Sequence, residues 1–489
     1  MKTLLLILLT LPAAASLVVD PGPGDESMRS PRYRVVVSGG DAENVESFVY
    51  RSENNADFQK FPRGTFMAKA NHWTSISADG PVTIEVSMPD SPSFKRVRIR
   101  PTSRGVKVEP TRSGARFTLE NPGAYAVEID AFDPLIPHPL LVFFNPPEEA
   151  LPEGRGIWNF AEKGLPPADR TEPVLLHFPR GVHNLVRDHG VPLRPGSQLK
   201  SGDIVHLAPG AYVIGAFGSD RRSKNITLRG RGTLSGLGEP FVKSKYRPLR
   251  ADAEIEFSYN RCAEHLVHLQ GSGHRVEGLV FTDPTHFNVN IGDQSRVENI
   301  KCFGWHYSTD GLGLGEGTVV RDCFIKCNDD SFKLYANDID IGRCVIWQQF
   351  NGGAFQFSWG HGGVSRGATV RDIDIIHDEH RRDANNRGLI SCVELNSPMR
   401  GLTFENIRVE GDCYRLFDLR VQDGGSIEDL VLRNISVEGR ILDANHLRAR
   451  GGRFANVVID NVSIGGKSAT DPESLVLKME GKVPAPVFQ

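Results

Sequence analysis

Three aspartates in one short stretch of the chain have the types and spacing needed for acid–base chemistry. Residues 308–335 read STDGLGLGEGTVVRDCFIKCNDDSFKLY and contain Asp310, Asp329 and Asp330. The alternating run DGLGL that begins at Asp310 aligns with the run DSFKL that begins at Asp330, at an offset of 20 residues. Neighbouring strands of a sheet lie about 4.8 Å apart. We therefore expect these runs to be adjacent rungs of one coil and the three carboxylates to meet in space.

Carboxylates this close raise the pKa of at least one member, which then stays protonated near neutral pH. An acid beside a carboxylate can protonate a leaving oxygen while its partner activates water, as glycosidic hydrolysis requires. Aspartates also form structural ladders or calcium sites in coils of this kind, but three acids converging on one polar face favour catalysis. Seven further side chains are candidate sugar contacts: Asn288, His306, Tyr307, Lys333, Tyr335, Trp359 and His361.

The elements that would position these residues come from a repeat. A four-residue pattern with an apolar residue at each end occurs as VEGL at 276, VENI at 297, VRDC at 320, IGRC at 341, VRDI at 370, FENI at 404, LRNI at 432 and IDNV at 459. Repeats of 21 to 34 residues without helical segments are typical of a solenoid. This spacing predicts a right-handed parallel β-helix.

A second column of alternating residues runs alongside the first, in segments that include VNI at 289, LGL at 312, FKL at 332, FQF at 355, VEL at 393 and FDL at 417. Apolar residues of such segments point inward and the residues between them point outward. The outward row is polar and mixed in charge, as a groove for a neutral sugar chain would be. A solvated sheet face is the alternative, and the carboxylates at its edge favour the groove.

The whole chain is predicted to be all-β, with an N-terminal β-sandwich followed by the β-helix. Residues 1–16, MKTLLLILLTLPAAAS, have the charged start, apolar core and small-residue end of a signal peptide, which predicts a secreted or periplasmic protein. Residues 17–145 carry short alternating segments typical of a β-sandwich, interpreted as a structural or carbohydrate-binding accessory domain. Residues 146–173 are rich in Pro, Gly and Glu and are predicted to be a linker, and residues 174–489 form the catalytic β-helix.

Charge and composition limit the classes of partner that the protein is expected to bind. The net charge of −3 and the lack of a basic block argue against nucleic-acid binding, and no later segment is apolar for long enough to span a bilayer. Seven cysteines between residues 262 and 413 have no zinc or framework spacing and are expected to be buried thiols. The HDEH run at residues 377–380 is a weak metal pattern. We expect a monomer that acts on a polysaccharide without cofactor or metal.

At this point the sequence resembles glycoside hydrolase family 49, the dextranases and isopullulanases. The resemblance rests on TDG at 309 and NDDSFKLY at 328, followed by IW at 346, FSW at 357 and IIH at 375. Members of that family also have an N-terminal β-sandwich before a β-helix, and the runs RIRP at 98 and LVFFNPP at 141 look similar. The resemblance covers most of the mature chain, and the aspartate spacing is its most specific part.

The resemblance implies an inverting hydrolase of α-glycosidic bonds, with a dextran- or pullulan-like α-glucan as substrate. Asp329 would match the general acid, and Asp310 and Asp330 the carboxylates that hold and activate water. Lys333, Tyr335 and Trp359 would be substrate contacts. Residues 357–361, FSWGH, depart from the usual Gly-Trp of the family, and this departure bears on the substrate more than on the reaction.

Other classes share the predicted coil. The polygalacturonase family has a similar trio of acids, and STDG at 308 and GHG at 360 resemble its motifs. However, His361 lies 31 residues after Asp330, and no Arg-x-Lys follows it to hold a galacturonate carboxylate. A neutral glucan is therefore favoured over pectin. A polysaccharide lyase would need a basic residue and usually calcium, and a non-catalytic glycan-binding β-helix would have no reason to bring three acids together.

Overall fold

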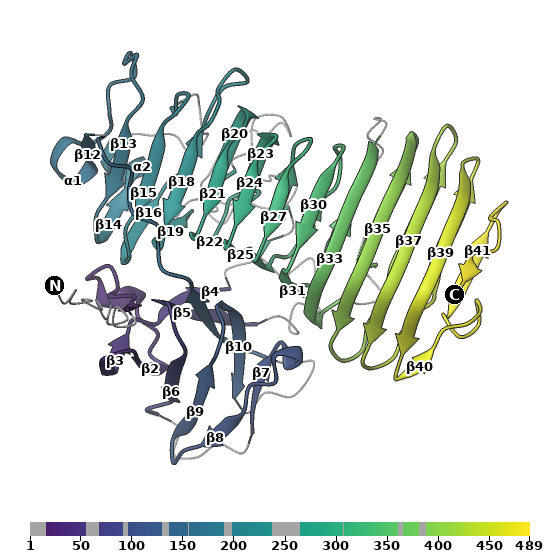
Figure 1. The fold of residues 1–489 in the computed structure, drawn as a ribbon, viewed down its shortest axis with the longest axis horizontal. Coiled ribbons are helices and arrows are strands. Elements are labelled where there is room, and N and C mark those ends of the chain that lie inside the picture. The colour runs from purple at the N-terminus through teal and green to yellow at the C-terminus, as the bar shows by residue number, and fades with distance from the viewer. Residues whose placement is uncertain are drawn as a thin grey trace, which may run out of the picture.

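The computed structural model describes residues 16–54, 68–90, 96–129, 136–154, 156–189, 198–236, 265–306, 308–359, 365–380 and 388–489. These residues are nearly all β, with short helices α1 (Phe160–Lys163) and α2 (Leu185–His189) and 3₁₀ turns η1 (Glu26–Met28) and η4 (Thr102–Arg104). Figure 1 shows two parts: a group of mainly antiparallel strands from residues 17–145, here called the N-terminal part, and a long row of parallel strands from residues 157–489, here called the coil.

The described N-terminal part contains two sheets that share one core. The first has six strands, β1 (Leu17–Val19), β4 (Tyr50–Glu53), β5 (Ala70–Ala78), β7 (Val97–Arg100), β10 (Gly123–Ile129) and β11 (Leu140–Asn145). The second has five, β2 (Arg34–Gly39), β3 (Ala42–Ser47), β6 (Val82–Ser87), β8 (Val108–Pro110) and β9 (Gly114–Leu119). Apolar residues of both sheets, among them Val35, Ile84, Phe117, Val127 and Val142, form a single buried cluster. The alternating segments thus bury one face each, as their period of two predicts.

The described coil forms two parallel sheets. Ten strands make the first, β17 (Phe217–Gly218), β20 (Val267–Ser272), β23 (Val289–Asp293), β26 (Leu312–Leu314), β29 (Phe332–Lys333), β32 (Phe355–Gln356), β34 (Ile390–Leu395), β36 (Phe417–Gln422), β38 (Asn445–Arg450) and β41 (Leu477–Glu480). We call this ten-stranded sheet the site sheet. Its strand order follows the sequence, so each turn of the chain adds one rung.

The second sheet of the described coil has 21 strands in two merged columns. They are β12 (Ile157–Asn159), β13 (Leu175–Phe178), β14 (Gly181–Asn184), β15 (Ile204–Leu207), β16 (Ala211–Ile214), β18 (Thr227–Gly230), β19 (Thr233–Ser235), β21 (Arg275–Glu277), β22 (Val280–Thr282), β24 (Arg296–Glu298), β25 (Lys301–Phe303), β27 (Val319–Arg321), β28 (Phe324–Lys326), β30 (Ile339–Gly342), β31 (Val345–Gln348), β33 (Ser365–Asp378), β35 (Pro398–Val409), β37 (Ser426–Val437), β39 (Arg453–Ile464), β40 (Lys467–Ser468) and β42 (Val487–Phe488). Both coil sheets enclose one continuous apolar core. This parallel, nearly all-β arrangement is that of a β-helix, as predicted.

The repeat predicted from the sequence sets the register of the 21-stranded sheet. Val276 pairs with Val297, and the pairing continues through the first residue of each later pattern to Ile459. The third residue sits at a corner with positive φ, for example 54° at Asn406 and 51° at Asn434, a conformation that Asn and Asp tolerate best among non-glycine residues. The side-chain amide of Asn434 also donates to that of Asn406 at 3.1 Å. The pattern therefore encodes both core and corners.

One register prediction was wrong. The sequence pattern placed VEL at 393 beside FQF at 355, but the structure pairs Phe355 with Ile390 and Gln356 with Ser391. In the pairing of β34 with β36, the register shifts between Cys392 and Leu395. An irregularity of this kind is not visible in a sequence alternation, because apolar residues recur on both sides of it.

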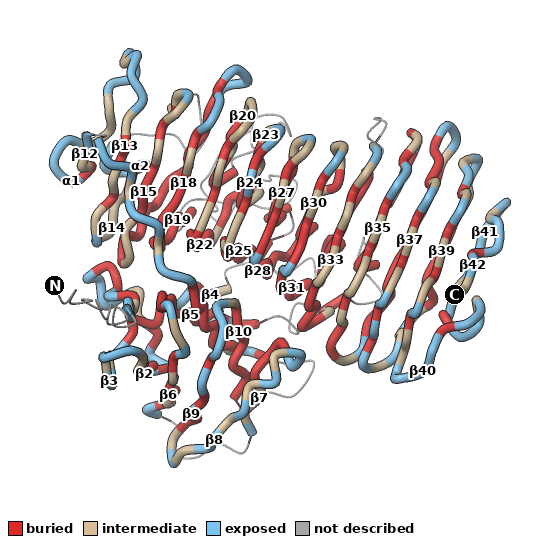
Figure 2. Tube along the Cα trace, in the orientation of Figure 1, coloured by how far each residue is buried: buried red, intermediate tan, exposed pale blue. Residues whose placement is uncertain are grey.

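The N-terminal part packs on the coil through aromatic residues. Every residue of β5 and of β11 is buried, since one face meets the second N-terminal sheet and the other meets the coil. Trp73 and Phe143 contact Phe303 of the coil, with ring centroids 5.3 and 5.9 Å apart. Figure 2 shows buried residues gathered around β4 and β5, where the two parts meet.

Three further predictions, for the linker, the cysteines and the signal peptide, can be compared with the structure. The predicted linker contains β12 and α1, and β12 pairs in parallel with β13, so the first rung lies inside that segment. Six cysteines fall within the described residues, and all six are buried thiols without a disulfide. Residues 1–15 of the predicted signal peptide lie outside the described residues.

Within the described residues, no helix has the length and apolarity needed to cross a membrane.

Candidate active site

The three aspartates meet on the site sheet, as their spacing predicts. Leu312 of β26 pairs with Phe332 of β29, which places Asp310 and Asp330 two residues ahead of these strands on adjacent rungs. One carboxylate oxygen from each of Asp310, Asp329 and Asp330 lies within 4.8 Å of the others, and all three residues are buried. We call this group the acid trio.

Lys333 supplies the positive charge of the acid trio. Its Nζ lies 2.7 Å from Oδ1 of Asp310 and 2.6 Å from Oδ2 of Asp330, and it also lies over the rings of Phe287 and Tyr335 at 5.1 and 5.4 Å. Burial lowers the pKa of Lys333, but the carboxylates outweigh burial and hold that pKa well above its usual value. Three carboxylates in this geometry could ligate a cation, and the Lys333 ammonium already bridges two of them.

Asp310 is a member of the acid trio whose pKa is raised. Burial raises the pKa of Asp310 well above its usual value, and the charges of Asp329 and Asp330 raise it further, while Lys333 opposes the shift. Three carboxylates around one ammonium leave an excess of negative charge in a buried space. Keeping one carboxyl neutral is the least costly response.

Asp329 is surrounded by hydrogen-bond donors. Its Oδ2 accepts from the backbone N–H of Ser308 at 2.5 Å and from Nδ2 of Asn351 at 2.9 Å, and its Oδ1 accepts from the backbone N–H of Asp330 at 2.9 Å. Such donors favour the ionised form and fix the direction of the carboxylate. Gly352 passes so close above that a Cβ there would lie 2.2 Å from the backbone carbon of Asp329, and its φ is +81°. Only glycine fits this crossing.

The predicted sugar contacts divide into exposed and buried groups. Trp359 is 40% exposed and lies in a parallel bridge with Glu394, so its ring is free to stack on a sugar. Tyr335 is half-buried beside Lys333, and burial raises the pKa of its hydroxyl. His306 is buried, and its carbonyl accepts from the N–H of Thr309 at 3.2 Å. Tyr307 and His361 lie outside the described residues.

Asn288 corrects one prediction. It was expected to face outward as a sugar contact, but it is fully buried. Its Nδ2 donates to the carbonyl of Asp310 at 2.9 Å and to Sγ of Cys327 at 3.3 Å. Asn288 occupies the rung before Asp310 at the bend where the chain enters the strand, so its side chain turns along the coil rather than out of it. It holds the backbone of Asp310.

Imidazoles that the sequence did not single out extend the site toward the N-terminal end of the site sheet. His268 pairs with Asn290, which is two rungs before Lys333 in the same outward column. The His265 ring lies 4.9 Å from that of His268 and 4.7 Å from that of Phe287. Burial, His268 and Lys333 lower the pKa of His265 to about 3. The position of His268 in the outward column, three residues after His265, is the signal that could have revealed this pair.

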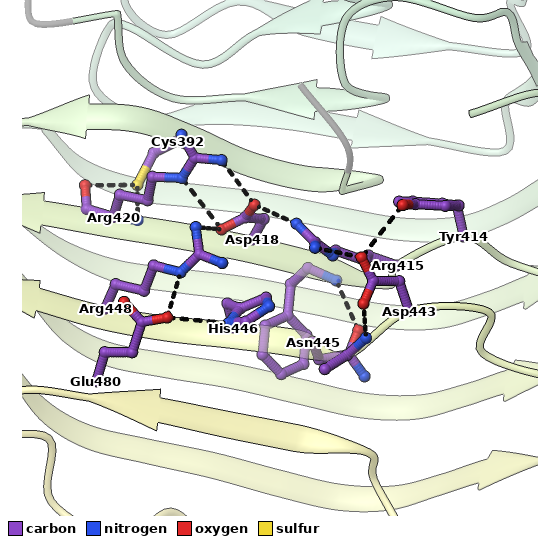
Figure 3. A network of polar contacts seen from close by, with 12 residues as sticks. Cys392, Tyr414, Arg415, Asp418, Arg420, Asp443, Asn445, His446, Arg448 and Glu480 are labelled. Carbon is purple, nitrogen blue, oxygen red and sulfur yellow. Dashed lines mark hydrogen bonds and ion pairs between the residues drawn. The ribbon is translucent and has the colours of Figure 1, made fainter. Parts of the chain in front are cut away.

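Toward the C-terminal end, the same column reaches a network of arginines and acids. The outward residues continue from Lys333 through Gln356 and Ser391 to Asp418. Arg415, Arg420 and Arg448 surround Asp418, and Asp443 and Glu480 complete the set (Figure 3). We call these six residues the arginine network. Three cations here meet three carboxylates.

Comparisons with known proteins agree with this arrangement. A dextranase of Arthrobacter sp. (strain CB-8) is 25% identical over 497 residues, which cover 86% of this chain and 73% of the relative. An isopullulanase of Aspergillus niger is 23% identical over 439 residues, covering 80% and 75%. The solved structure of Dex49A from Penicillium minioluteum superposes with a TM-score of 0.74 at 19% identity, covers 94% of each chain and shows the same fold. No family model matches the chain.

The fold and the acid trio define a glycoside hydrolase built on a parallel β-helix. The relatives confirm this class and the resemblance to dextranases and isopullulanases predicted from the aspartate motif.

Proposed function

We propose that the chain is a secreted, inverting glycoside hydrolase that cleaves α-glycosidic bonds in a neutral α-glucan of the dextran or pullulan kind. The observation that carries the proposal is the acid trio: three buried carboxylates within 4.8 Å, two of which contact one ammonium. Relatives of similar sequence include dextranases and an isopullulanase, which supports an α-glucan substrate.

The trio divides into a pair and a single carboxylate. Lys333 contacts Asp310 and Asp330, so these two share a counter-ion, whereas Asp329 is held separately by N–H donors. The pair can hold a water molecule from two sides and take its proton as it attacks the anomeric carbon. Asp329 then protonates the leaving oxygen, and the bond to that oxygen breaks. This division follows the family resemblance and requires no cofactor.

The charges of the free site support a competing assignment of the acid. Asp310 has the raised pKa, and Asp329 receives the donors that favour its ionised form. A substrate with an activated leaving group, such as an α-glucosyl fluoride, separates the two assignments because its departure needs no general acid. If Asp329 is the acid, Asp329→Asn keeps activity on the fluoride and Asp310→Asn loses it. The reverse result would assign the acid to Asp310.

Inversion is proposed from the resemblance, and the spacing makes it worth testing directly. Inverting pairs are usually about 6.5–9.5 Å apart and retaining pairs about 5–5.5 Å apart, whereas the closest oxygens here lie within 4.8 Å. An inverting mechanism therefore requires the attacking water to lie beside the Asp310–Asp330 pair rather than between the general acid and the general base. Proton NMR of the first product anomer is expected to show the β-anomer. An α-anomer would overturn inversion.

The balance of charge along the site sheet supports a neutral polysaccharide. In the described column from His268 to His446, Lys333 and the arginines of the network each contact a carboxylate. A polyanion such as polygalacturonate needs cations that are free to bind it, and the contacts within this column leave none of these four side chains without an acidic partner.

The test is product release from dextran, pullulan, polygalacturonate and other neutral polysaccharides. We expect activity on dextran or pullulan, reduced roughly 10²–10⁴-fold by Asp329→Asn, the usual contribution of a positioned acid or base. Circular dichroism of the variant controls for folding. Activity on polygalacturonate alone would replace this proposal with a pectin hydrolase, and binding without turnover would indicate a non-catalytic glycan-binding coil.

Two structural proposals accompany the function. The two sheets of the N-terminal part form a β-sandwich, supported by the core they share, and the coil is right-handed, as repeat coils with parallel crossovers are. Secretion is supported by the charged, apolar and small-residue segments of residues 1–16. The N-terminal residue of exported protein, read by mass spectrometry, tests cleavage after this segment.

A further inference from the structure

The N-terminal part contains no catalytic cluster among its described residues, yet one of its side chains reaches the segment that carries Asp310. Ser52 of β4 is buried, and its Oγ accepts from Nε1 of Trp305 at 2.8 Å and donates to Oδ1 of Asp283 at 2.6 Å. Trp305 follows β25 and lies five residues before Asp310. Ser52 thus joins the N-terminal part to the active-site segment of the coil.

From Trp305 a chain of hydrogen bonds continues to Asp329. The carbonyl of Trp305 accepts from Nδ2 of Asn328 at 2.9 Å, and Oδ1 of Asn328 accepts from the N–H of Asn351 at 3.0 Å. Nδ2 of Asn351 then donates to Oδ2 of Asp329 at 2.9 Å. All of these groups are buried. Buried hydrogen bonds in series transmit displacement, because no member can move without leaving a polar group unpaired.

The Trp305 ring has a second restraint. The ammonium of Lys326 lies 4.8 Å from the ring of Trp305 and 4.6 Å from that of Trp347, and no hydrogen-bond partner lies among the residues that the structure describes. Burial lowers the pKa of Lys326 to about 8. A cation between two aromatic faces attracts both rings and restrains them. In this position the indole N–H of Trp305 donates to Ser52.

We propose that Ser52 is a positioning residue for the reaction: through Trp305, Asn328 and Asn351 it sets the direction of the Asp329 carboxylate, so that the N-terminal part completes the active site. Other described polar contacts between the two parts include Ser103 to Asp374 and Arg100 to Glu410 on later strands, and Asn145 to Lys301 at the start of β25. This inference rests on the proposed hydrolase function.

The test compares Ser52→Ala with Ser52→Thr, which keeps the hydroxyl. Ser47→Ala is the matched control, because the Ser47 hydroxyl is also buried in the N-terminal part but bonds to Thr74 at 2.7 Å, away from the coil. On the polysaccharide that the wild-type enzyme cleaves, we expect Ser52→Ala to lower kcat about tenfold with KM unchanged. Ser52→Thr should restore most of the loss, and Ser47→Ala should leave kcat unchanged.

A pH profile separates positioning from general loss of structure. If Asn351 no longer holds its bond, Asp329 loses a donor that stabilises its ionised form, and its pKa rises. The limb of the kcat profile governed by Asp329 should then move to higher pH in Ser52→Ala and not in Ser47→Ala. An unchanged kcat in Ser52→Ala, or equal losses in both alanine variants, would overturn the proposal.

A second measurement does not depend on activity. The Trp305 indole N–H, assigned in a ¹H–¹⁵N spectrum by its loss in Trp305→Phe, should exchange with solvent about tenfold faster in Ser52→Ala and at the wild-type rate in Ser52→Thr. If the wild-type protein cleaves no polysaccharide, the proposed function fails and this exchange rate decides whether the Ser52 link exists. Unchanged exchange in Ser52→Ala would show that it does not.

Discussion

The acid trio and the arginine network lie on the same face of the same sheet, yet the pKa of an aspartate is raised in one and lowered in the other. Burial acts on both Asp310 and Asp418 and would raise the pKa of each. At Asp310, two neighbouring carboxylates add to the rise and one ammonium opposes it. At Asp418, Arg420, Arg448 and Arg415 outweigh burial, and the pKa falls below its usual value.

The difference lies in the ratio of charges. The trio has three carboxylates and one lysine, which contacts two of them, whereas three carboxylates meet three arginines in the network. Carboxylates that are matched by cations stabilise the rung on which they lie. Where carboxylates outnumber cations, one carboxyl can keep a proton near neutral pH and transfer it. Both regions lie on rungs of the same sheet, so we attribute the opposite pKa shifts to the charges around each aspartate.

The strongest test of this comparison removes one aspartate from each region. Asp418→Asn removes the buried carboxylate that Arg415, Arg420 and Arg448 share, although Arg415 keeps Asp443 and Arg448 keeps Glu480. It is expected to lower the free energy of unfolding by about 3–5 kcal/mol. Asp310→Asn relieves repulsion and should leave stability equal or higher while activity falls. Urea unfolding monitored by circular dichroism measures both. Equal destabilisation by the two variants would contradict the contrast.

Removing Lys333 should shift the pH dependence of catalysis. Without this ammonium, the pKa of Asp310 rises further, because an opposite charge at such distances lowers a carboxyl pKa by about 1–3 units. The base must be ionised to work, so the acidic limb of the kcat/KM profile should move up by about 1–3 pH units in Lys333→Met. Arg448→Met, in the arginine network, is the control and should leave that limb in place.

The titration of Asp310 should appear in stability as well as in activity. Because its folded pKa is raised, Asp310 contributes stability that is full below the unfolded pKa of about 3.9 and is lost as the pH rises toward the folded value. The difference in Tm between the wild type and Asp310→Asn should therefore favour the wild type most at acid pH and decline toward neutral pH. The folded pKa of Asp418 is lowered. The difference in Tm between the wild type and Asp418→Asn should therefore decline as the pH falls.

The smallest expected effect belongs to Trp359, which lies between the two regions. Its ring is exposed and contributes little to the core, so Trp359→Ala should not change Tm. Loss of an aromatic platform costs about 0.5–1.5 kcal/mol of contact, which corresponds to a rise in KM of roughly two- to tenfold. An unchanged KM with a lower Tm would show that the ring packs rather than binds.

Much of the fold and of the site can be predicted from the sequence. In a stacked coil, the spacing of two residues along the chain determines whether they lie on adjacent rungs. The offset of 20 residues between Asp310 and Asp330 gave their adjacency, and the four-residue repeat gave the register from Val276 to Ile459, since each rung pairs only with its neighbours. The prediction for Asn288 failed because a residue at a bend does not follow the alternation of a strand.

What the sequence alone determined is therefore periodic: the coil, its asparagine corners and the convergence of three carboxylates. Tertiary structure decided what periodicity does not encode. The pairing of Lys333 with Asp310 and Asp330 but not Asp329, the placing of Ser52 against Trp305, and the charge balance around Asp418 each depend on side chains from distant segments. Those contacts set which carboxyl keeps a proton, because a pKa depends on the surrounding charges and burial and not on position in the chain.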